Sequence, residues 1–413
     1  MKFVRTASTR RLLAVIGGLI AAIAAGTAIA VAAAGPGPIP KPKPLATAVH
    51  DALAAPKVAG ISARISFTNH LIDTSAFQGT DPIITGATGR LWISDNHQIR
   101  LELQSNNGDA QVVVNQHSWW ISDPAQNTVY EGTLPADHQS SDRAKKADSH
   151  GGIPTIAQIQ TDLTKLMKHV NVSGAIPSDV AGQPAYTVSV SPKHDGGLLG
   201  SAQVAWDAIR GVPLRLAIYA RGSSSPVLEL KATDISFGAV PASDFNVTPP
   251  AGSKVVKIST MGHANATQRR LYTFGKQAKH AAHHEQASGV SAVAARLPFK
   301  LQAPSTLVGL PRHSTELLDW GGKRAALVTY GQNLGGIAVI EQTQSAKSVQ
   351  QSSNQSQDGQ SGFSLPTVSI NGATAQELDT ALGTVVQFSR GGVSYIVLGS
   401  VPSAAADAAA RAL

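Results

Sequence analysis

Apolar and polar residues alternate along much of the first half of the chain. Apolar side chains recur at every second position in residues 61–67, 91–93, 99–103, 112–114, 119–121 and 128–130. Turn-forming residues such as Asp95–Asn96 and Asp123–Pro124 separate these segments. A period of two is typical of strands that bury one face. The pattern therefore predicts a meander of antiparallel strands with one apolar face.

The period changes to three and four over Pro154–Val170, where residues 156, 159, 163, 166 and 167 are apolar. This spacing predicts an amphipathic helix. A shorter helix is predicted over Leu45–Ala55, ending before Pro56. Strand patterns resume at 186–190, 204–206, 214–220 and 227–237. Residues 46–257 are therefore predicted to form one domain of nine or ten strands, with one helix before the strands and one inserted among them.

A long sheet with one apolar face has to cover that face. Two short helices are too small to cover a large curved sheet, which leaves room for an apolar cavity. A tightly packed core is the alternative.

Residues 297–413 are predicted to form a second, small α+β domain. Strands are expected at 327–330, 337–341, 367–370, 384–389 and 393–398, and Ser345–Gly362 reads as a loop rich in Gln and Ser. Ser403–Leu413 is predicted to be a closing helix with Ser403 as its N-cap. The last hairpin and helix resemble a small domain often appended to bacterial extracytoplasmic and anti-sigma-related proteins.

Leu12–Ala34 has 23 residues without a charge and follows four basic residues. At about 1.5 Å per residue it is long enough to span a bilayer. It is longer than the usual apolar region of a signal peptide, which favours an uncleaved anchor, although cleavage near Ala32–Ala34 stays open. Both alternatives place the rest of the chain outside the cytoplasm, either on the cell membrane or secreted. Gly35–Pro44 is predicted to be an extended spacer.

The net charge of +8 comes from two segments. Residues 1–45 have six basic and no acidic residues, and residues 254–296 have seven basic residues and Glu285. The remainder is slightly acidic, so the charge does not indicate nucleic-acid binding. The chain has no Cys, which excludes disulfides, thiolate metal sites and a lipid-modified cysteine.

Two segments carry a family resemblance. Val58–Phe67 resembles the first strand, and Val204–Leu216 resembles the strand–turn–strand, of the LolA/LolB/LppX/RseB superfamily of extracytoplasmic lipid- and lipoprotein-binding proteins. The resemblance covers about half of the chain. It implies an α+β fold in which an unclosed antiparallel β half-barrel is covered by helices and binds acyl chains in its hollow. The missing Cys and the apolar run 12–34 depart from members that are lipidated or that shuttle between membranes.

The apolar strand faces and this resemblance together indicate candidate ligand-binding positions. They are Ile65, Phe67, Leu91, Ile99, Leu101, Leu103, Val112, Val114, Trp119, Leu214, Leu216 and Ile218. Trp119 and Trp120 should point to opposite faces, one into the core and the other toward the cavity or a membrane surface.

No sequence motif for catalysis is found, because GxSxG, GxxxxGK[ST], HExxH and a phosphate-binding GxGxxG are all absent. Asp207 is predicted to make an Asx turn. The basic linker 258–296 contains His280 and His284, which on a helix would lie one turn apart and could share a metal ion. Because Glu285 follows this pair and does not complete an HExxH motif, a solvated linker or a surface helix is favoured over a metal site. No cofactor is expected.

The sequence thus predicts a non-enzymatic, exported or membrane-anchored protein that binds a lipid or an acylated lipoprotein. The alternative is an RseB-like envelope-stress sensor, whose second domain contacts a membrane-bound regulatory protein such as an anti-sigma factor.

Overall fold

The computed structural model describes residues 39–72, 82–104, 109–124, 126–134, 153–258, 287–320, 323–344 and 365–413. The apolar run Leu12–Ala34, residues 259–286 of the basic linker, the loop Ser345–Gly362 and the first residues of the spacer lie outside these ranges. None of the helices in the described ranges is long and apolar enough to cross a membrane.

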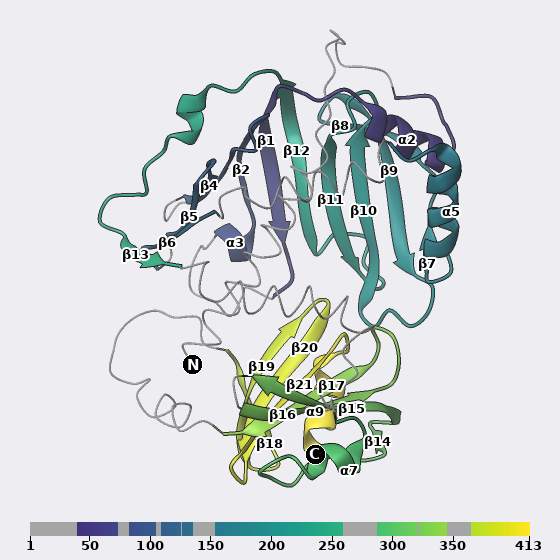
Figure 1. The fold of residues 1–413 in the computed structure, drawn as a ribbon, viewed down its shortest axis with the longest axis vertical. Helices are drawn as coiled ribbons and strands as arrows, with labels where there is room; N and C mark the ends of the chain where they lie inside the picture. Colours follow the sequence, from purple (N-terminus) through teal and green to yellow (C-terminus); the bar gives the residue numbers. More distant parts are fainter. Residues whose placement is uncertain are drawn as a thin grey trace.

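The first domain is a strongly curled sheet that is antiparallel except for the parallel pairing of β13 with β6 (Figure 1). Its strand order is β13-β6-β5-β4-β3-β2-β1-β12-β11-β10-β9-β7, and β8 pairs with β9 beside this path. The strands are β1 (Gly60–Asn69), β2 (Ala87–Ser94), β3 (Ile99–Leu103), β4 (Ala110–Val114), β5 (Ser118–Asp123), β6 (Thr128–Thr133), β7 (Val170–Val172), β8 (Ile176–Val180), β9 (Gln183–Pro192), β10 (Leu199–Asp207), β11 (Pro213–Ala220), β12 (Leu228–Phe237) and β13 (Lys254–Lys257).

The described residues thus form 13 strands, against the nine or ten predicted. The additional ones are short and do not alternate clearly. Strand β1 joins the two halves of the sheet, since it pairs with β2 on one side and β12 on the other. A bulge at Arg64–Ile65 interrupts the β1–β12 register, and such bulges increase the local twist of a sheet. The predicted half-barrel is therefore confirmed as a curled, unclosed sheet.

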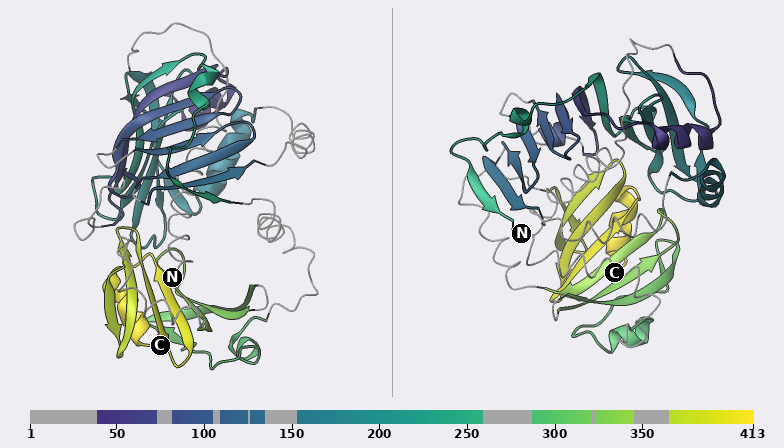
Figure 2. Two further views of the ribbon diagram at one scale, coloured as in Figure 1. Left: turned by 90° about the vertical axis from the view of Figure 1, so that its left-hand side faces the viewer. Right: turned by 45° about the horizontal axis from the view of Figure 1, so that its top comes forward.

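Helices lie on the concave side of this sheet (Figure 2). Helix α2 (Leu45–Ala54) packs Ala48 against Tyr186 and Trp206 of β9 and β10. Helix α5 (Ile156–Leu166) begins with a capping box between Thr155 and Gln158 and packs against α2. A four-residue turn, α3 (Pro82–Thr85), covers part of the concave face near β1.

The convex side carries a strap that runs from β12 to β13 (Figure 1). It contains the 3₁₀ turn η3 (Ala242–Phe245), in which Phe245 is buried. The Trp120 indole Nε1 donates a hydrogen bond to the carbonyl of Val247, and Trp120 packs with Val113 and Val129. Trp120 is thus the core indole of the Trp119–Trp120 pair.

The second domain is an antiparallel sheet in the order β14-β15-β16-β17-β21-β20-β19-β18. Its elements are α7 (Val290–Ala294), β14 (Thr306–Leu307), β15 (Leu310–Trp320), β16 (Lys323–Tyr330), β17 (Ile337–Thr343), β18 (Thr367–Ile370), β19 (Ala373–Thr380), β20 (Gly383–Arg390), β21 (Val393–Gly399) and α9 (Ser403–Arg411). The prediction that Ser403 is the N-cap of α9 is wrong. Pro402 occupies that position and no side chain caps the helix, because the chain turns into α9 one residue earlier.

In the part of the chain that the structure describes, hydrogen bonds join the two domains at two places. The Leu198 amide, in the β9–β10 hairpin, donates to the Ser400 carbonyl at 3.0 Å. The Ala381 amide, in the turn between β19 and β20, donates to the Leu71 carbonyl just after β1 at 2.8 Å. The second domain therefore docks at one end of the curled sheet, next to its concave face (Figure 1).

Candidate ligand site on the concave face

Two rows of apolar side chains cross the concave face. Antiparallel pairing places directly opposed residues on the same face of a sheet. One row joins Val188, Val204, Leu216, Leu230 and Phe67 across β9, β10, β11, β12 and β1. The next row joins Val190, Ala202, Ile218 and Leu228 across β9 to β12.

These rows are partly open. Val204 is 37% exposed to solvent, and four more residues of the rows are half-buried: Leu216, Ile218, Leu228 and Leu230. Apolar side chains on the inner face of a curved sheet are normally covered by the protein's own core. The half-covered rows are therefore apolar surface that a ligand can contact.

The opposite face of the same strands is polar and internally paired. Arg215 donates from Nε to Glu229 Oε1 at 2.7 Å, from Nη1 to Gln203 Oε1 at 2.8 Å and from Nη2 to the Tyr219 hydroxyl at 2.6 Å. Strands β10 to β12 thus present hydrogen-bonded polar groups on the convex side and aliphatic groups on the concave side. An apolar ligand fits the concave side.

The concave face continues into a closed core over β1 to β4. Ile83 of α3 is buried in this cluster together with Ile65, Phe67 and Leu101. A recess lined by Ile83, Leu101, Leu103, Ala110, Gln111, Val112, Ile121 and Ser122 has room for only about one water molecule. In this half of the sheet the expected cavity is filled, because Ile83 occupies the space between α3 and the strands.

The twelve candidate residues all lie on the concave face but differ in accessibility. Buried members of the core cluster are Ile65, Phe67, Leu91, Ile99, Leu101, Leu103 and Leu214, and Val112 and Val114 pack against it. Leu216 and Ile218 belong to the open rows. Two of the twelve therefore offer open surface beside Val204, and nine belong to or border the closed core.

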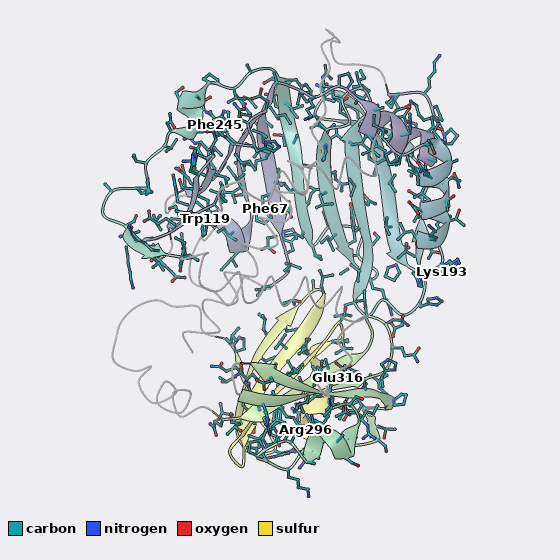
Figure 3. The ribbon with its side chains drawn as sticks, viewed as in Figure 1. Phe67, Trp119, Lys193, Phe245, Arg296 and Glu316 are labelled. Atoms are coloured by element: carbon teal, nitrogen blue, oxygen red, sulfur yellow. The ribbon has the colours of Figure 1, made fainter. Side chains whose placement is uncertain are left out.

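Trp119 lies at the far end of the face, near the edge strands β6 and β13 (Figure 3). It is half-buried and pairs with Val114 and Gly132. A Cβ atom on Gly132 would stand 2.8 Å from the indole ring, so the ring lies directly over the Gly132 backbone. The placement of Trp119 and Trp120 on opposite faces agrees with the sequence prediction.

The chain leading into α2 is fastened to the rim of this face. The Tyr186 hydroxyl donates to the Lys41 carbonyl at 2.6 Å, and the Lys43 ammonium lies 5.5 Å from the centre of the Tyr186 ring. Lys43 also pairs with Asp51 at 2.6 Å; this hydrogen bond raises the pKa of Lys43 and lowers that of Asp51. The end of the predicted spacer is therefore held beside β9.

Asp207 makes the predicted Asx turn. Its Oδ1 accepts hydrogen bonds from the amides of Ile209 and Arg210, each at 2.7 Å, and its Oδ2 pairs with Arg210 Nη1 at 3.1 Å. The carboxylate is fully buried, and the Arg210 guanidinium lies 4.2 Å from the Phe237 ring centre. All these contacts hold the β10–β11 hairpin, so Asp207 has a structural role.

Within the described ranges, no group of three or more His, Cys, Asp or Glu residues could hold a metal ion. The cluster of His280, His284 and Glu285 lies outside those ranges.

No family model matches the chain, and no curated protein matches it. Among solved structures, the MucA/MucB complex of Pseudomonas aeruginosa is similar over 89% of this chain and 94% of the matched chain, with 16% identity and a TM-score of 0.36. An uncharacterized conserved protein from Thermus thermophilus matches 52% of this chain and 97% of its own, with 9% identity and a TM-score of 0.31.

A putative outer membrane lipoprotein-sorting protein domain from Vibrio parahaemolyticus is also similar. It covers 49% of this chain and 95% of its own, with 12% identity and a TM-score of 0.18. Because all of these TM-scores lie below 0.5, the fold is assigned from the chain's own strand order and pairing.

Several residues of the open rows were missed from the sequence. Val188, Val190, Val204, Leu228 and Leu230 lie in predicted strands and follow the same period of two. Their alternation could have placed them on the apolar face. Their position beside Leu216 and Ile218 depends on the pairing of β9 to β12, which the alternation alone does not specify.

Proposed function

We propose that this chain is an extracytoplasmic protein that binds an acyl chain of a lipid or lipoprotein on the concave face of its first domain. The observation that carries the proposal is the pair of half-exposed apolar rows across β9 to β12, centred on Val204, Leu216 and Ile218. The polar convex side of the same strands supports the choice of face.

The energetics suit a carrier. Each methylene that leaves water contributes about 0.8 kcal/mol, so burial of about ten methylenes of an acyl chain supplies about 8 kcal/mol, the binding free energy of a micromolar complex. A carrier needs no chemistry, and the proposed role is not enzymatic. Export or anchoring by Leu12–Ala34 would place the site outside the cytoplasm, on the cell membrane or in a secreted form.

A charge placed in the open rows tests the site. Val204→Glu is expected to weaken binding of a fluorescent fatty acid at least tenfold, because the carboxylate would be desolvated beneath the acyl chain. Val204 is partly exposed, so this substitution should leave the fold intact. Binding is measured by fluorescence titration, and native mass spectrometry of protein from membrane extracts reports lipid that co-purifies.

Val255→Glu is the matched control. Val255 is also an exposed strand valine, at 49%, but lies on β13 at the edge of the sheet. Its affinity for the fatty acid should stay within about twofold of the wild type. Equal affinities of the wild type and Val204→Glu, or no binding by the wild type, would sink the proposal.

A regulatory role is the second candidate. The hydrogen bonds of Leu71 with Ala381 and of Leu198 with Ser400 join the second domain to the end of the ligand face. A solved structure shows MucB in complex with MucA(peri), and a membrane-bound regulatory protein is the corresponding partner proposed here. Capture of a membrane protein by the full chain, and its loss when residues 287–413 are removed, would favour this role over a simple carrier.

A further inference from the structure

The turn α3 fills the deep part of the concave face. Ile83 is 6% exposed and packs into the cluster that contains Phe67 and Leu101. The water-sized recess lies directly between Ile83 and strands β3 to β5. A ligand chain that extended from the open rows toward β3 would meet the Ile83 side chain. Ile83 therefore stands where a longer apolar ligand would continue.

Contacts with β1 hold the turn in place. A helix of four residues is too short to be stable alone. The buried Asn69 side chain donates from Nδ2 to the Ile83 carbonyl at 2.8 Å. Gly86 follows with φ of +81°, and a Cβ there would lie 2.7 Å from the Phe67 carbonyl. The buried Ile83 side chain, the hydrogen bond from Asn69 and a glycine that allows close approach to β1 thus contribute to seating the turn.

The same Asn69 side chain also holds the chain that reaches the second domain. Its Oδ1 accepts a hydrogen bond from the Leu71 amide at 3.0 Å. The Leu71 carbonyl in turn accepts the 2.8 Å hydrogen bond from the Ala381 amide. The buried Asn69 side chain is therefore hydrogen-bonded both to α3 and to Leu71, the residue that binds the second domain.

We infer that α3 is a built-in plug of the acyl site, and that Asn69 couples displacement of this plug to the docking of the second domain at Ala381. The inference rests on the proposed function and adds a regulation to it. A bound acyl chain takes the place of Ile83 and moves the Ile83 carbonyl away from Asn69. A buried amide that loses a partner has to find another. Its reorientation releases Leu71 and weakens the Leu71–Ala381 hydrogen bond.

Hydrogen exchange tests the coupling in the full chain, with dansyl-undecanoic acid as the acyl probe. Exchange of the peptide that contains Ala381 is followed by mass spectrometry with and without saturating probe. We expect the probe to accelerate exchange at Ala381 about tenfold in the wild type. Asn69→Ala should exchange about tenfold faster without probe and show no further response to it.

Two more variants separate the parts of the mechanism. Ile83→Ala removes the plug side chain but keeps the carbonyl that Asn69 binds, and it should bind the probe about tenfold more tightly. Asn171→Ala is the matched control, because Asn171 makes an amide-to-carbonyl hydrogen bond with Pro192 in the same sheet, at β7. It should leave both the probe affinity and the exchange at Ala381 unchanged.

The outcomes distinguish this inference from the proposed function. A wild type that binds the probe while exchange at Ala381 stays constant would overturn the coupling and leave lipid binding intact. Unchanged affinity of Ile83→Ala would overturn the role of α3 as a plug. Failure of both the wild type and Ile83→Ala to bind any probe would overturn the proposed function itself. Should Asn69→Ala not fold, the wild type and Ile83→Ala still decide the matter.

Discussion

Glu341→Gln is expected to stabilise the second domain at neutral and alkaline pH. Glu341 is fully buried on β17, where its Oε2 accepts a hydrogen bond from the Gln302 amide at 2.9 Å. Its Oε1 has no hydrogen-bond partner among the described residues. Burial raises the pKa of Glu341 from 4.5 to about 7. The folded domain therefore prefers the protonated, neutral carboxyl.

The sign of the pH dependence follows from this shift. Below pH 4.5 the carboxyl is protonated in both the folded and unfolded chain, so its burial has no ionic cost. As the pH rises from 4.5 to about 7, the unfolded chain ionises first and the free energy of unfolding falls by up to about 3 kcal/mol. Above pH 7 the loss is complete. The amide of Gln cannot ionise and can still accept the Gln302 hydrogen bond, so the variant should lack most of this decline.

Thermal unfolding between pH 4 and 8.5 measures the effect. Burial also raises the pKa of Glu377, so a smaller decline should remain in Glu341→Gln. Glu316→Gln is a suitable control, because Glu316 is only half-buried on β15 of the same domain (Figure 3). If the unfolding temperatures of the wild type and Glu341→Gln changed with pH in the same way, the prediction would be wrong, because Glu341 would then ionise in the folded protein without a loss of stability.

Asp207→Ala is expected to destabilise the first domain by about 3–5 kcal/mol, the usual loss when one partner of a buried ion pair is removed. The substitution deletes two backbone hydrogen bonds of the β10–β11 turn and leaves the Arg210 guanidinium, 9% exposed, without its carboxylate. The turn also contacts α2, since a Cβ on Gly211 would stand 2.2 Å from the Ala52 carbonyl. Loss of the turn should therefore loosen α2 over Trp206 as well.

Urea unfolding of two Asp207 variants separates the contribution of the carboxylate charge from that of the hydrogen bonds in the β10–β11 turn. Asp207→Asn keeps an oxygen that can accept from the Ile209 and Arg210 amides, so its loss should be smaller than that of Asp207→Ala. Asp162→Ala is the control, because Asp162 pairs with Lys165 in an exposed position, 74% open, where such pairs contribute little. Equal stability of Asp207→Ala and Asp162→Ala would contradict the assigned role.

Periodicity predicted most of the sheet because β1 to β6 and β9 to β12 each bury one face. It missed β7, β8 and β13. Strand β7 has only three residues and begins at Val170, where the predicted helix was expected to end, β8 contains Pro177, and β13 consists of two valines between lysines. It also missed α3, because four residues carry no period. Their helical form depends on Ile83 and Asn69, which meet only in the folded chain.

The candidate site was predictable only in part, because the solvent exposure of its residues depends on contacts that form only in the folded chain. Alternation placed all twelve residues on one face, and that face is the concave one. Which of them remain open depends on where α2 and α3 lie, and neither position follows from local sequence. Glu341 was within reach of sequence reasoning. It continues the alternation of Ile337 and Val339 in a predicted strand, which places a carboxyl among apolar side chains.

The chain leaves the first domain after β13, which pairs with β6 at the edge of the sheet opposite to β7. The hydrogen bonds that dock the second domain lie elsewhere, just after β1 and in the β9–β10 hairpin. The second domain is thus attached at one place and docked at others. If the docking bonds break, the domain stays tethered, at an effective concentration on the order of millimolar. Undocking and redocking are then unimolecular events. Their balance should not depend on how much protein is present, and the second domain returns to its place without finding a new partner.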